Sequence, residues 1–330
     1  MPLVSVVMLS YNHEEFIAES IESVLGQDFD DFELITVDDA STDSSRQIIQ
    51  KYAAEDSRIR VILHEANCGI AKTVNDGIEA AKGKFIATTA SDDVWAKDKL
   101  TKQLAVIASN ENLIVWSEGE VIDRKGEPIG ETVTEFQAFR RNVSRKMSGD
   151  IFERLLISYY VFGSTLLFKK ANLGEIRFDE SLMYLNDYKF VLDLAREYEF
   201  YYIAEPLAQY RVHGKNTLEG SDPEAPKRRR RAQHEQIALG QEMLRRHDHI
   251  ISDTTKARIY AKMGFSYRFL GDNKAALICG LRVIKYYPLN RSNLLGAARF
   301  LKLVGLNLLN SGIPERNSLK KGTKLHQKKG

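Results

Sequence analysis

Apolar positions in the first two hundred residues follow two alternating patterns. Short runs rich in β-branched residues predict buried strands. Longer segments with apolar side chains three or four residues apart predict amphipathic helices. Strands alternating with helices indicate an α/β domain with a mostly parallel sheet. The predicted strands are Leu3–Leu9, Phe32–Val37, Ile59–Leu63, Phe85–Thr89, Leu113–Ile122, Thr165–Phe168 and Phe200–Ala204. The predicted helices are Glu14–Leu25, Asp43–Ala54, Ile70–Ala81, Lys97–Ala108, Ile151–Ser158 and Tyr188–Glu197.

Two details of this region lie outside the simple alternation. In the strand Leu113–Ile122 we expect the polar residues Ser117 and Glu118 to face outward. The stretch 127–148 is polar and poorly periodic, and we expect it to form an irregular excursion.

Beyond about residue 214 the pattern predicts helices alone. A polar linker, Gly214–Pro226, precedes helices expected at 227–248, 254–270, 273–286 and 292–309. One tetratricopeptide-like repeat is expected at about 257–290, and because one repeat cannot bury its own face it should pack on the flanking helices. Its spacing rests on Gly264, Tyr267, Gly271, Asp272, Ala276 and Pro288. The alternative, which the absence of a second full repeat favours, is a helical hairpin that covers the α/β domain. The predicted organisation is an α/β domain at 1–215, a helical domain at 216–312 and a basic, disordered tail at 313–330.

Composition narrows the class of protein. The net charge is only +2 over 330 residues, so the chain is not expected to bind nucleic acid. Cys68 and Cys279 are far apart, which argues against a disulfide framework or a cysteine zinc site and favours a reducing compartment.

Localisation follows from the apolar segments. Met1–Leu9 fits a first strand better than a signal peptide, and no apolar run reaches the roughly 18–20 residues that span a bilayer. We therefore predict a cytoplasmic protein. Apolar and basic residues from Leu294 onward permit peripheral contact with the cytoplasmic membrane face, and a core helix with a solvated tail is the alternative.

Acidic turns follow two of the predicted strands. Asp38-Asp39 comes after Phe32–Val37, and Ser91-Asp92-Asp93 comes after Phe85–Thr89. Ligands bind at the carboxyl ends of strands in such sheets, so both turns should lie in one cleft with Tyr11, which follows the first strand. Adjacent carboxylates repel unless a cation or ligand lies between them, and their oxygens suit Mg²⁺ or Mn²⁺. The alternative is that these acids cap the helices that follow.

Tyr11 and three further side chains are candidates for a role in this cleft, and each has an ordinary alternative. Tyr11 could stack on a nucleobase or lie on the rim. Lys72, near a helix N-terminus, suits a diphosphate or is simply solvated. Asp187 lies among apolar and aromatic residues, where a carboxylate can have a raised pKa and act as a general base, or it caps the helix after it. His213 could contact a diphosphate or a metal, or be structural.

The order of these motifs resembles that of family 2 glycosyltransferases with the GT-A fold, a Rossmann-like, mostly parallel sheet. The resemblance covers about residues 2–215 and rests on several motifs in the right order. These are Val4–Asn12, Val37–Asp43, Asn67–Ile70, Ser91–Trp95, Phe178–Glu180, Asn186-Asp187 and Tyr210–His213.

The resemblance implies an inverting transferase that uses a nucleotide-sugar donor, by default a UDP-sugar, and a divalent metal, Mn²⁺ or Mg²⁺. The implied acceptor is a hydroxyl of a bacterial surface glycan or of its lipid-linked precursor. Asp187 corresponds to the general base, and Asp92 and Asp93, with His213 as a further candidate, correspond to the metal region. The implied donor-binding residues are Ser10, Tyr11, Asn12, Asp38, Asp39, Lys72, Ser91 and Asp92.

Two departures from the family pattern leave questions open. Ala90 stands where the metal motif commonly has its first acid, so either Asp92 or Asp93 could be the ligand. Asn186 replaces the first acid of the usual Glu-Asp pair, while Asp187 remains.

The motifs of two other classes of protein are absent from the sequence. A Rossmann oxidoreductase would need G-x-G-x-x-G where Ser10–His13 stands, and a sugar nucleotidyltransferase would need an early glycine-rich phosphate loop. The remaining alternative is a non-catalytic, nucleotide-sugar-binding or scaffold protein that works through its helical domain. That domain could bind a protein partner or a second copy of the chain.

Overall fold

The computed structural model describes residues 1–139, 147–214 and 223–286, with side chains omitted for 137–139. Its strands form one mixed sheet. The strands are β1 (Val4–Ser10), β2 (Phe32–Asp38), β3 (Ile59–Leu63), β4 (Phe85–Ala90), β5 (Val94–Trp95), β6 (Ile114–Ile122), β7 (Pro128–Thr132), β8 (Leu167–Lys169) and β9 (Phe200–Arg211). The helices of the α/β part are α1 (Ile17–Leu25), α2 (Ser45–Glu55), α3 (Ile70–Ala80), α4 (Lys99–Ile107), α5 (Val133–Phe139), α6 (Phe152–Ile157) and α7 (Asn186–Glu197). The short 3₁₀ segments are η1 (Gly163–Thr165) and η2 (Lys170–Leu173).

The sheet has the strand order β3-β2-β1-β4-β8-β6-β9-β5, and β7 pairs with β6. Strands β3, β2, β1 and β4 are parallel, as the alternating pattern predicted. Strand β8 joins antiparallel to both β4 and β6, and β9 then runs parallel to β6. Because two successive antiparallel pairings restore the original direction, β6 and β9 point the same way as β1. Their carboxyl ends therefore share one edge of the sheet.

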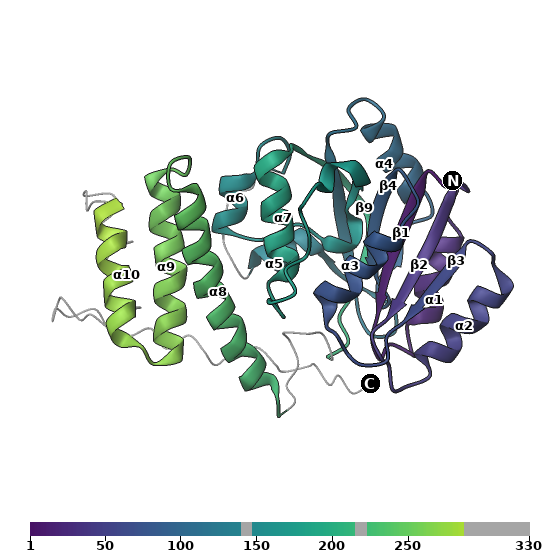
Figure 1. Ribbon diagram of the computed structural model, residues 1–330, viewed down its shortest axis with the longest axis horizontal. Coiled ribbons are helices and arrows are strands. Elements are labelled where there is room, and N and C mark those ends of the chain that lie inside the picture. The colour runs from purple at the N-terminus through teal and green to yellow at the C-terminus, as the bar shows by residue number, and fades with distance from the viewer. Residues whose placement is uncertain (140–146, 215–222, 287–330) are drawn as a thin grey trace, which may run out of the picture.

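Both faces of the sheet are covered by helices, because alternate side chains of a strand point to opposite faces. On β1, Val4, Val6 and Met8 pack in the apolar cluster that includes Ile17 and Ile21 of α1. The intervening Val7 packs in the other cluster, with Val74 and Ile78 of α3 and with residues of α6 and α7. The α/β part is thus a three-layer structure with its site-bearing loops at one end (Figure 1).

The structure differs from the predicted pattern in four places. Strand β5 is too short to show a periodicity, and β9 extends to Arg211 instead of ending at Ala204. The stretch expected to be irregular contains β7 and α5. Ser117 and Glu118, expected to face outward, are buried, because β6 lies inside the sheet with helices on both faces. The Glu118 carboxylate accepts hydrogen bonds from the amide of Thr134 (3.0 Å) and the hydroxyl of Tyr202 (2.9 Å).

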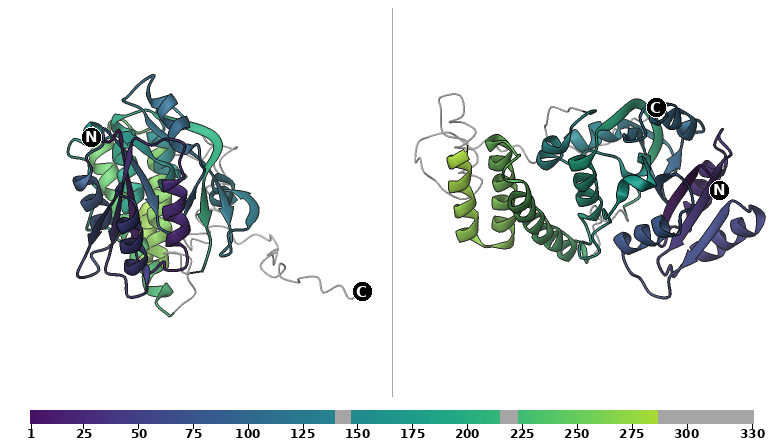
Figure 2. Two further views of the ribbon diagram at one scale, coloured as in Figure 1. Left: turned by 90° about the vertical axis from the view of Figure 1, so that its right-hand side faces the viewer. Right: turned by 45° about the horizontal axis from the view of Figure 1, so that its top comes forward.

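Within residues 223–286, three antiparallel helices follow the α/β part, α8 (Ala225–His247), α9 (Asp253–Leu270) and α10 (Asn273–Tyr286). Figures 1 and 2 show them side by side at one end of the molecule, with α8 nearest the α/β part. Residues of α8 and α9, such as Met243 and Met263, belong to the same apolar cluster as α6 and α7. The helices expected at 227–248, 254–270 and 273–286 are confirmed, and the one expected at 292–309 lies outside the described residues.

The α9–α10 hairpin matches the position of the predicted tetratricopeptide-like repeat. Gly271 ends α9 in the left-handed conformation (φ 90°), where glycine carries no Cβ penalty. The hairpin also exposes large apolar side chains, as expected of a single repeat. These are Phe265, Phe269, Leu277, Ile278 and Leu281. The domain boundaries at 215 and 312 stay predictions, and the tail at 313–330 lies outside the residues that the structure describes.

A search of the described ranges for a helix both long and apolar enough to cross a bilayer found none.

Candidate active site

The predicted cleft residues lie at the carboxyl edge of the sheet. In the parallel register Ser10 of β1 is level with Asp38 of β2, and Leu9 is level with Ala90 of β4. The loops that follow these three strands are therefore neighbours, as the sequence predicted. Strand β9 has the same direction, so the chain leaving it at Arg211 reaches the same edge.

Asp92 lies between two histidines at this edge. Its Oδ2 is 3.1 Å from Nε2 of His213, and its Oδ1 is 3.8 Å from Nδ1 of His13. One ligand atom from each of the three residues lies within 4.8 Å of the other two, a separation that one metal ion could bridge. His13 also makes a 2.8 Å hydrogen bond with Ser91 Oγ, and its ring packs edge-on against that of His213. The structure thus brings Asp92, His213 and Ser91 together and adds His13.

Asp93 faces a different set of partners. Its Oδ2 accepts a short hydrogen bond from the Ser164 hydroxyl, and its Oδ1 is 3.3 Å from the amide nitrogen of Arg211. The Arg211 side chain is itself buried, and its Nε donates to the carbonyl of Asp92 (3.1 Å) while its NH2 donates to Glu19 (2.6 Å). Asp93 therefore fastens the turn to the protein interior, whereas Asp92 meets the histidines.

The two neighbouring carboxyl groups have pKa values shifted in opposite directions. Burial raises the pKa of Asp92, but the hydrogen bond from His213 and the positive charges of His13 and His213 outweigh it, so the pKa ends below its ordinary value. Burial and the negative charge of Asp92 raise the pKa of Asp93 well above its ordinary value. The downward shift favours the ionised form of Asp92.

Asp39 organises the loop before α3. Its carboxylate accepts hydrogen bonds from the amides of Cys68 (2.7 Å) and Gly69 (2.8 Å), and His64 Nδ1 lies 2.9 Å from Oδ1. Gly69 has a φ of 86°, a left-handed conformation that glycine adopts readily. Asp39, His64 and Cys68 also have close ligand atoms. Because two backbone amides already use both oxygens of Asp39, this cluster fits a loop anchor better than a metal site.

Asp38 is fully buried and serves the turn that follows β2. Its carboxylate accepts from Ser41 and forms an ion pair with Arg46 Nε at 2.7 Å. Ser10 Oγ lies 3.4 Å from the same carboxylate. A role for Asp38 and Ser10 in holding the donor stays a prediction, and their contacts show how they could act by shaping the loop.

Asn12 and Tyr11 occupy the loop after β1. Asn12 has a φ of 54°, and its Oδ1 accepts a hydrogen bond from the Thr42 amide (2.8 Å), which joins this loop to the one after β2. Tyr11 is 43% exposed, so its ring is accessible at the edge where the strand ends meet.

Lys72 lies in the first turn of α3 and pairs with Asp76. The hydrogen bond to Asp76 raises the pKa of the Lys72 ammonium. Asp76 Oδ2 in turn lies 3.0 Å from His64 Nε2, whose other nitrogen meets Asp39. A continuous chain of polar contacts thus links Lys72 to the loop anchored by Asp39.

Asp187 lies in the first turn of α7, and its Oδ1 accepts a hydrogen bond from the amide of Tyr188 (2.7 Å). Only residues 198 and 199 separate α7 from β9, so the helix runs against the direction of the strand. The N-terminus of α7 therefore lies toward the carboxyl edge of the sheet, the same edge as Asp92. The alternative, that Asp187 caps this helix, holds only in part. Asp187 accepts from the Tyr188 amide, but the N-cap position is taken by Leu185, which makes no side-chain cap hydrogen bond.

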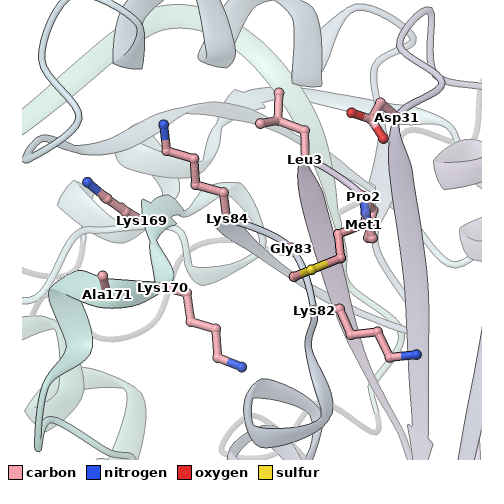
Figure 3. A pocket seen from close by; sticks show the side chains of 10 residues that line it. All are labelled: Met1, Pro2, Leu3, Asp31, Lys82, Gly83, Lys84, Lys169, Lys170 and Ala171. Atoms are coloured by element: carbon pink, nitrogen blue, oxygen red, sulfur yellow. The ribbon is translucent and has the colours of Figure 1, made fainter.

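A pocket of ≈ 580 Å³ lies at the opposite, amino end of β1 and is lined by lysines (Figure 3). Lys84 and Lys169 both pair with Glu111, and Lys170 Nζ donates to the carbonyl of Ala81 (2.5 Å). These ammonium groups are already engaged, and the pocket contains none of the motif residues. It does not belong to the candidate site.

Sequence reasoning missed three residues that the structure connects to the site. His13 stands in the same loop as Tyr11, and this position in the sequence could have identified it as a site residue. Arg211 is a buried cation in a strand, and only its tertiary contacts reveal its link to Asp92. Glu235 lies on α8 in line with the buried Leu239 and Met243. A carboxylate on an apolar helix face was the sequence pattern that could have identified it.

Comparisons with known proteins identify relatives of this chain among the glycosyltransferases. A family model described as glycosyl transferase family 2 matches residues 5–173. An uncharacterized glycosyltransferase of Methanocaldococcus jannaschii, MJ1057, is 31% identical over 215 residues, covering 64% of this chain and 71% of that protein. TuaG of Bacillus subtilis, named for teichuronic acid biosynthesis, is 40% identical over 128 residues, or 39% of this chain. A third relative, the Escherichia coli glucosyltransferase WfgD, is 37% identical over 121 residues, or 37% of this chain. The chain spans about half the length of TuaG (51%) and WfgD (47%).

Solved structures of low identity share the fold. Staphylococcus aureus TarS 1–349 has a TM-score of 0.60 at 20% identity, covering 93% of this chain and 89% of that one. The mannosyltransferase PcManGT of Pyrobaculum calidifontis has a TM-score of 0.55 at 17% identity, covering 92% of this chain and 84% of that one. The predicted GT-A architecture with appended helices is thereby confirmed. With the family model covering half of the sequence, the chain belongs to glycosyltransferase family 2.

Proposed function

We propose that this protein transfers a sugar from a nucleotide-diphosphate donor to a hydroxyl of a glycan or lipid-linked glycan, with inversion and with Asp187 as general base. The observation that carries the proposal is the placement of two acids at one sheet edge. Asp92 lies between His13 and His213, and Asp187 opens the helix whose N-terminus faces that edge. Family membership supports the reaction class.

The donor set at Asp92 fits a divalent cation. One carboxylate oxygen and two imidazole nitrogens suit Mn²⁺ better than Mg²⁺, which prefers oxygen ligands. Asp92, His13 and His213 would hold the ion, which would supply positive charge opposite the departing diphosphate. Asp93 is left out of this set, because its oxygens contact Ser164 and Arg211.

The protein residues then divide the remaining work. Asp187 accepts the proton of the acceptor hydroxyl as that oxygen forms its bond to the anomeric carbon. The bond from that carbon to the diphosphate oxygen breaks in the same displacement, so the configuration inverts. Tyr11 offers an accessible ring for the base, and Lys72 offers a cation at the first turn of α3.

The relatives support a choice of substrates for testing. TarS has been solved with UDP and with UDP-GlcNAc, and PcManGT with GDP-Man and Mn²⁺. The name of WfgD gives UDP-Glc as donor and a GlcNAc-diphosphoundecaprenol as acceptor. We infer a UDP-sugar as donor, and an acceptor that is a surface glycan or its lipid-linked precursor.

An acceptor on a lipid carrier is consistent with a cytoplasmic protein that touches the membrane face. This contact is proposed for the basic C-terminal residues, and liposome flotation of the intact chain against one ending near residue 312 tests it. Equal flotation of the two chains would argue against an anchoring tail.

The decisive experiment measures donor binding and turnover together. Thermal unfolding is recorded with UDP, GDP and their sugars in the presence of Mn²⁺, and stabilisation by one nucleotide identifies the donor class. Donor hydrolysis and transfer are then compared for the wild type and Asp187→Asn. We expect the variant to retain nucleotide binding and lose transfer. Absence of any hydrolysis in the wild type would favour the non-catalytic scaffold instead.

A further inference from the structure

The segment that leads into α7 is held by a carboxylate from the helical region. Glu235 of α8 is buried, with 6% of its surface exposed. Its Oε1 accepts a hydrogen bond from the amide of Met183 (2.9 Å), and its Oε2 accepts from the amides of Tyr184 (2.8 Å) and Leu185 (3.1 Å). Three successive amides therefore converge on one side chain about fifty residues later in the chain.

Glu235 brings a carboxylate to the amino end of α7. The first amides of a helix lack intrahelical partners, and a carboxylate there also interacts favourably with the helix dipole. Leu185 stands at the N-cap position of α7 and its apolar side chain makes no cap hydrogen bond. Glu235 accepts from the amide of the N-cap residue Leu185 and from the two amides before it, so its carboxylate lies at the positive end of the helix dipole. Hydrogen bonds from amides to a carboxylate are stronger than neutral ones.

The same segment is fastened at its other end by α3. Asn75 accepts a hydrogen bond from the amide of Phe178 at Oδ1 (3.0 Å), and its Nδ2 donates to the carbonyl of Phe178 (2.9 Å). The chain from Phe178 to Leu185 is therefore held between α3, which carries Lys72, and α8, which carries Glu235. Asp187 follows this held segment by two residues.

The buried charge of Glu235 has a partner on its own helix. Arg231 Nε lies 3.3 Å from Oε1, four residues earlier on α8. Half of the Arg231 side chain is exposed (52%), so the pair reaches from the surface to the amides. This contact places a positive charge beside the carboxylate that accepts from three amides.

We propose that Glu235 is a positioning residue for the transfer reaction, which makes α8 a working part of the active site and not only a cover for it. Glu235 sets the direction of the first turn of α7 and thereby the place of the Asp187 carboxylate. The inference rests on the proposed role of Asp187 as general base.

The test compares Glu235→Gln and Glu235→Ala with a matched control, Glu242→Gln. Glu242 lies on the same helix, and its ion pairs are with Arg246 and, at 3.7 Å, with Lys189 of α7, whereas the amides of residues 183–185 donate to Glu235. We expect kcat to fall roughly 10- to 100-fold in both Glu235 variants, since a small misplacement of a reacting group costs this much. The nucleotide Kd should stay within about twofold of the wild type, and the control should keep its kcat.

A merely structural role would give different results. Wild-type kcat in Glu235→Gln would overturn the inference, as would a parallel loss of kcat and nucleotide binding. If Glu235→Ala does not fold, Glu235→Gln keeps the shape of the side chain and carries the test alone. Hydrogen exchange of the amides of residues 183–185 should accelerate in the Glu235 variants and not in the control, and unchanged exchange would also overturn the proposal.

Asp187→Asn separates this inference from the proposed function. If that variant transfers sugar at the wild-type rate, the proposed general base is wrong, whatever the Glu235 variants do. If that variant keeps only a small residual rate of transfer, the double variant Asp187→Asn/Glu235→Gln should have the same residual rate. A further loss in the double variant would show that Glu235 acts by another route.

Discussion

His213 Nε2 lies 3.1 Å from Asp92 Oδ2, although the two residues are 121 positions apart in the chain. The contact joins the turn after β4 to the segment that follows β9. The last strand in chain order therefore leads a side chain directly to the acidic turn. It gives the first of four expectations about this molecule.

Replacing His213 should weaken metal binding. We expect His213→Ala to reduce Mn²⁺ affinity by on the order of 10- to 100-fold, because the variant removes one nitrogen ligand and the hydrogen bond that orients Asp92. Isothermal titration with Mn²⁺ measures the change. His249→Ala, an exposed histidine outside the site, serves as control. Equal Mn²⁺ affinity in the two variants would remove His213 from the metal site.

The two acids of the turn should respond differently to the same change. Asp92→Asn should abolish Mn²⁺-dependent donor binding, whereas Asp93→Asn should leave Mn²⁺ affinity within about twofold of the wild type. An asparagine at 93 keeps a carbonyl oxygen for the Arg211 amide and offers its NH₂ to Ser164, so we expect its unfolding free energy to change by about 1 kcal/mol or less. The reverse order of effects on Mn²⁺ would assign the ligand to Asp93.

Gly77 should not tolerate even a methyl group. A Cβ there would lie 2.4 Å from Cγ1 of Val7 and 3.2 Å from Cγ2 of Val37, where α3 packs on β1 and β2. We expect Gly77→Ala to lower the free energy of unfolding by about 1–3 kcal/mol through overpacking. Urea denaturation measures it, with Gly163→Ala as control, because a Cβ at Gly163 would meet no atom within 4 Å. Equal stability of the two variants would contradict this account.

Glu33 should make the fold sensitive to acid. Burial raises the pKa of Glu33. Hydrogen bonds from Ser5, Arg60 and the Lys82 amide together lower it by more, so the pKa in the folded protein lies below its ordinary value. Ionised Glu33 therefore contributes its full stabilisation of the fold above its pKa in the unfolded chain, about 4.3. This stabilisation is lost as the pH falls through the lower pKa of the folded protein.

This pH dependence is tested by measuring the free energy of unfolding of the wild type and of Glu33→Gln from neutral pH to below pH ~4. We expect Glu33→Gln to be less stable than the wild type near pH 7, since it loses the ion pair with Arg60 at 2.9 Å. The difference should shrink as the pH falls below about 4. A constant difference across this range would show that the charge of Glu33 does not stabilise the fold.

Local patterns in the sequence were enough to predict most of the fold. The run Ile59–Leu63 coincides with β3, and the helical spacing from Ile70 predicted α3 to within one residue. Such elements are determined by the burial of their own side chains. The two-residue β5 and the buried Glu118 could not be predicted, because both depend on which strand lies beside them.

The sequence alone also determined that acidic turns end β2 and β4 and that parallel strands bring them to one edge. Tertiary structure decided what each acid does there. Asp38 is buried against Arg46, Asp39 holds the amides of a loop, and Asp93 faces Ser164, while Asp92 meets the histidines. A pattern of residues fixes which strand end a carboxylate follows. Only the packing of chain segments far apart in sequence fixes the partner that each carboxylate meets, as with Glu235 on α8 and the start of α7.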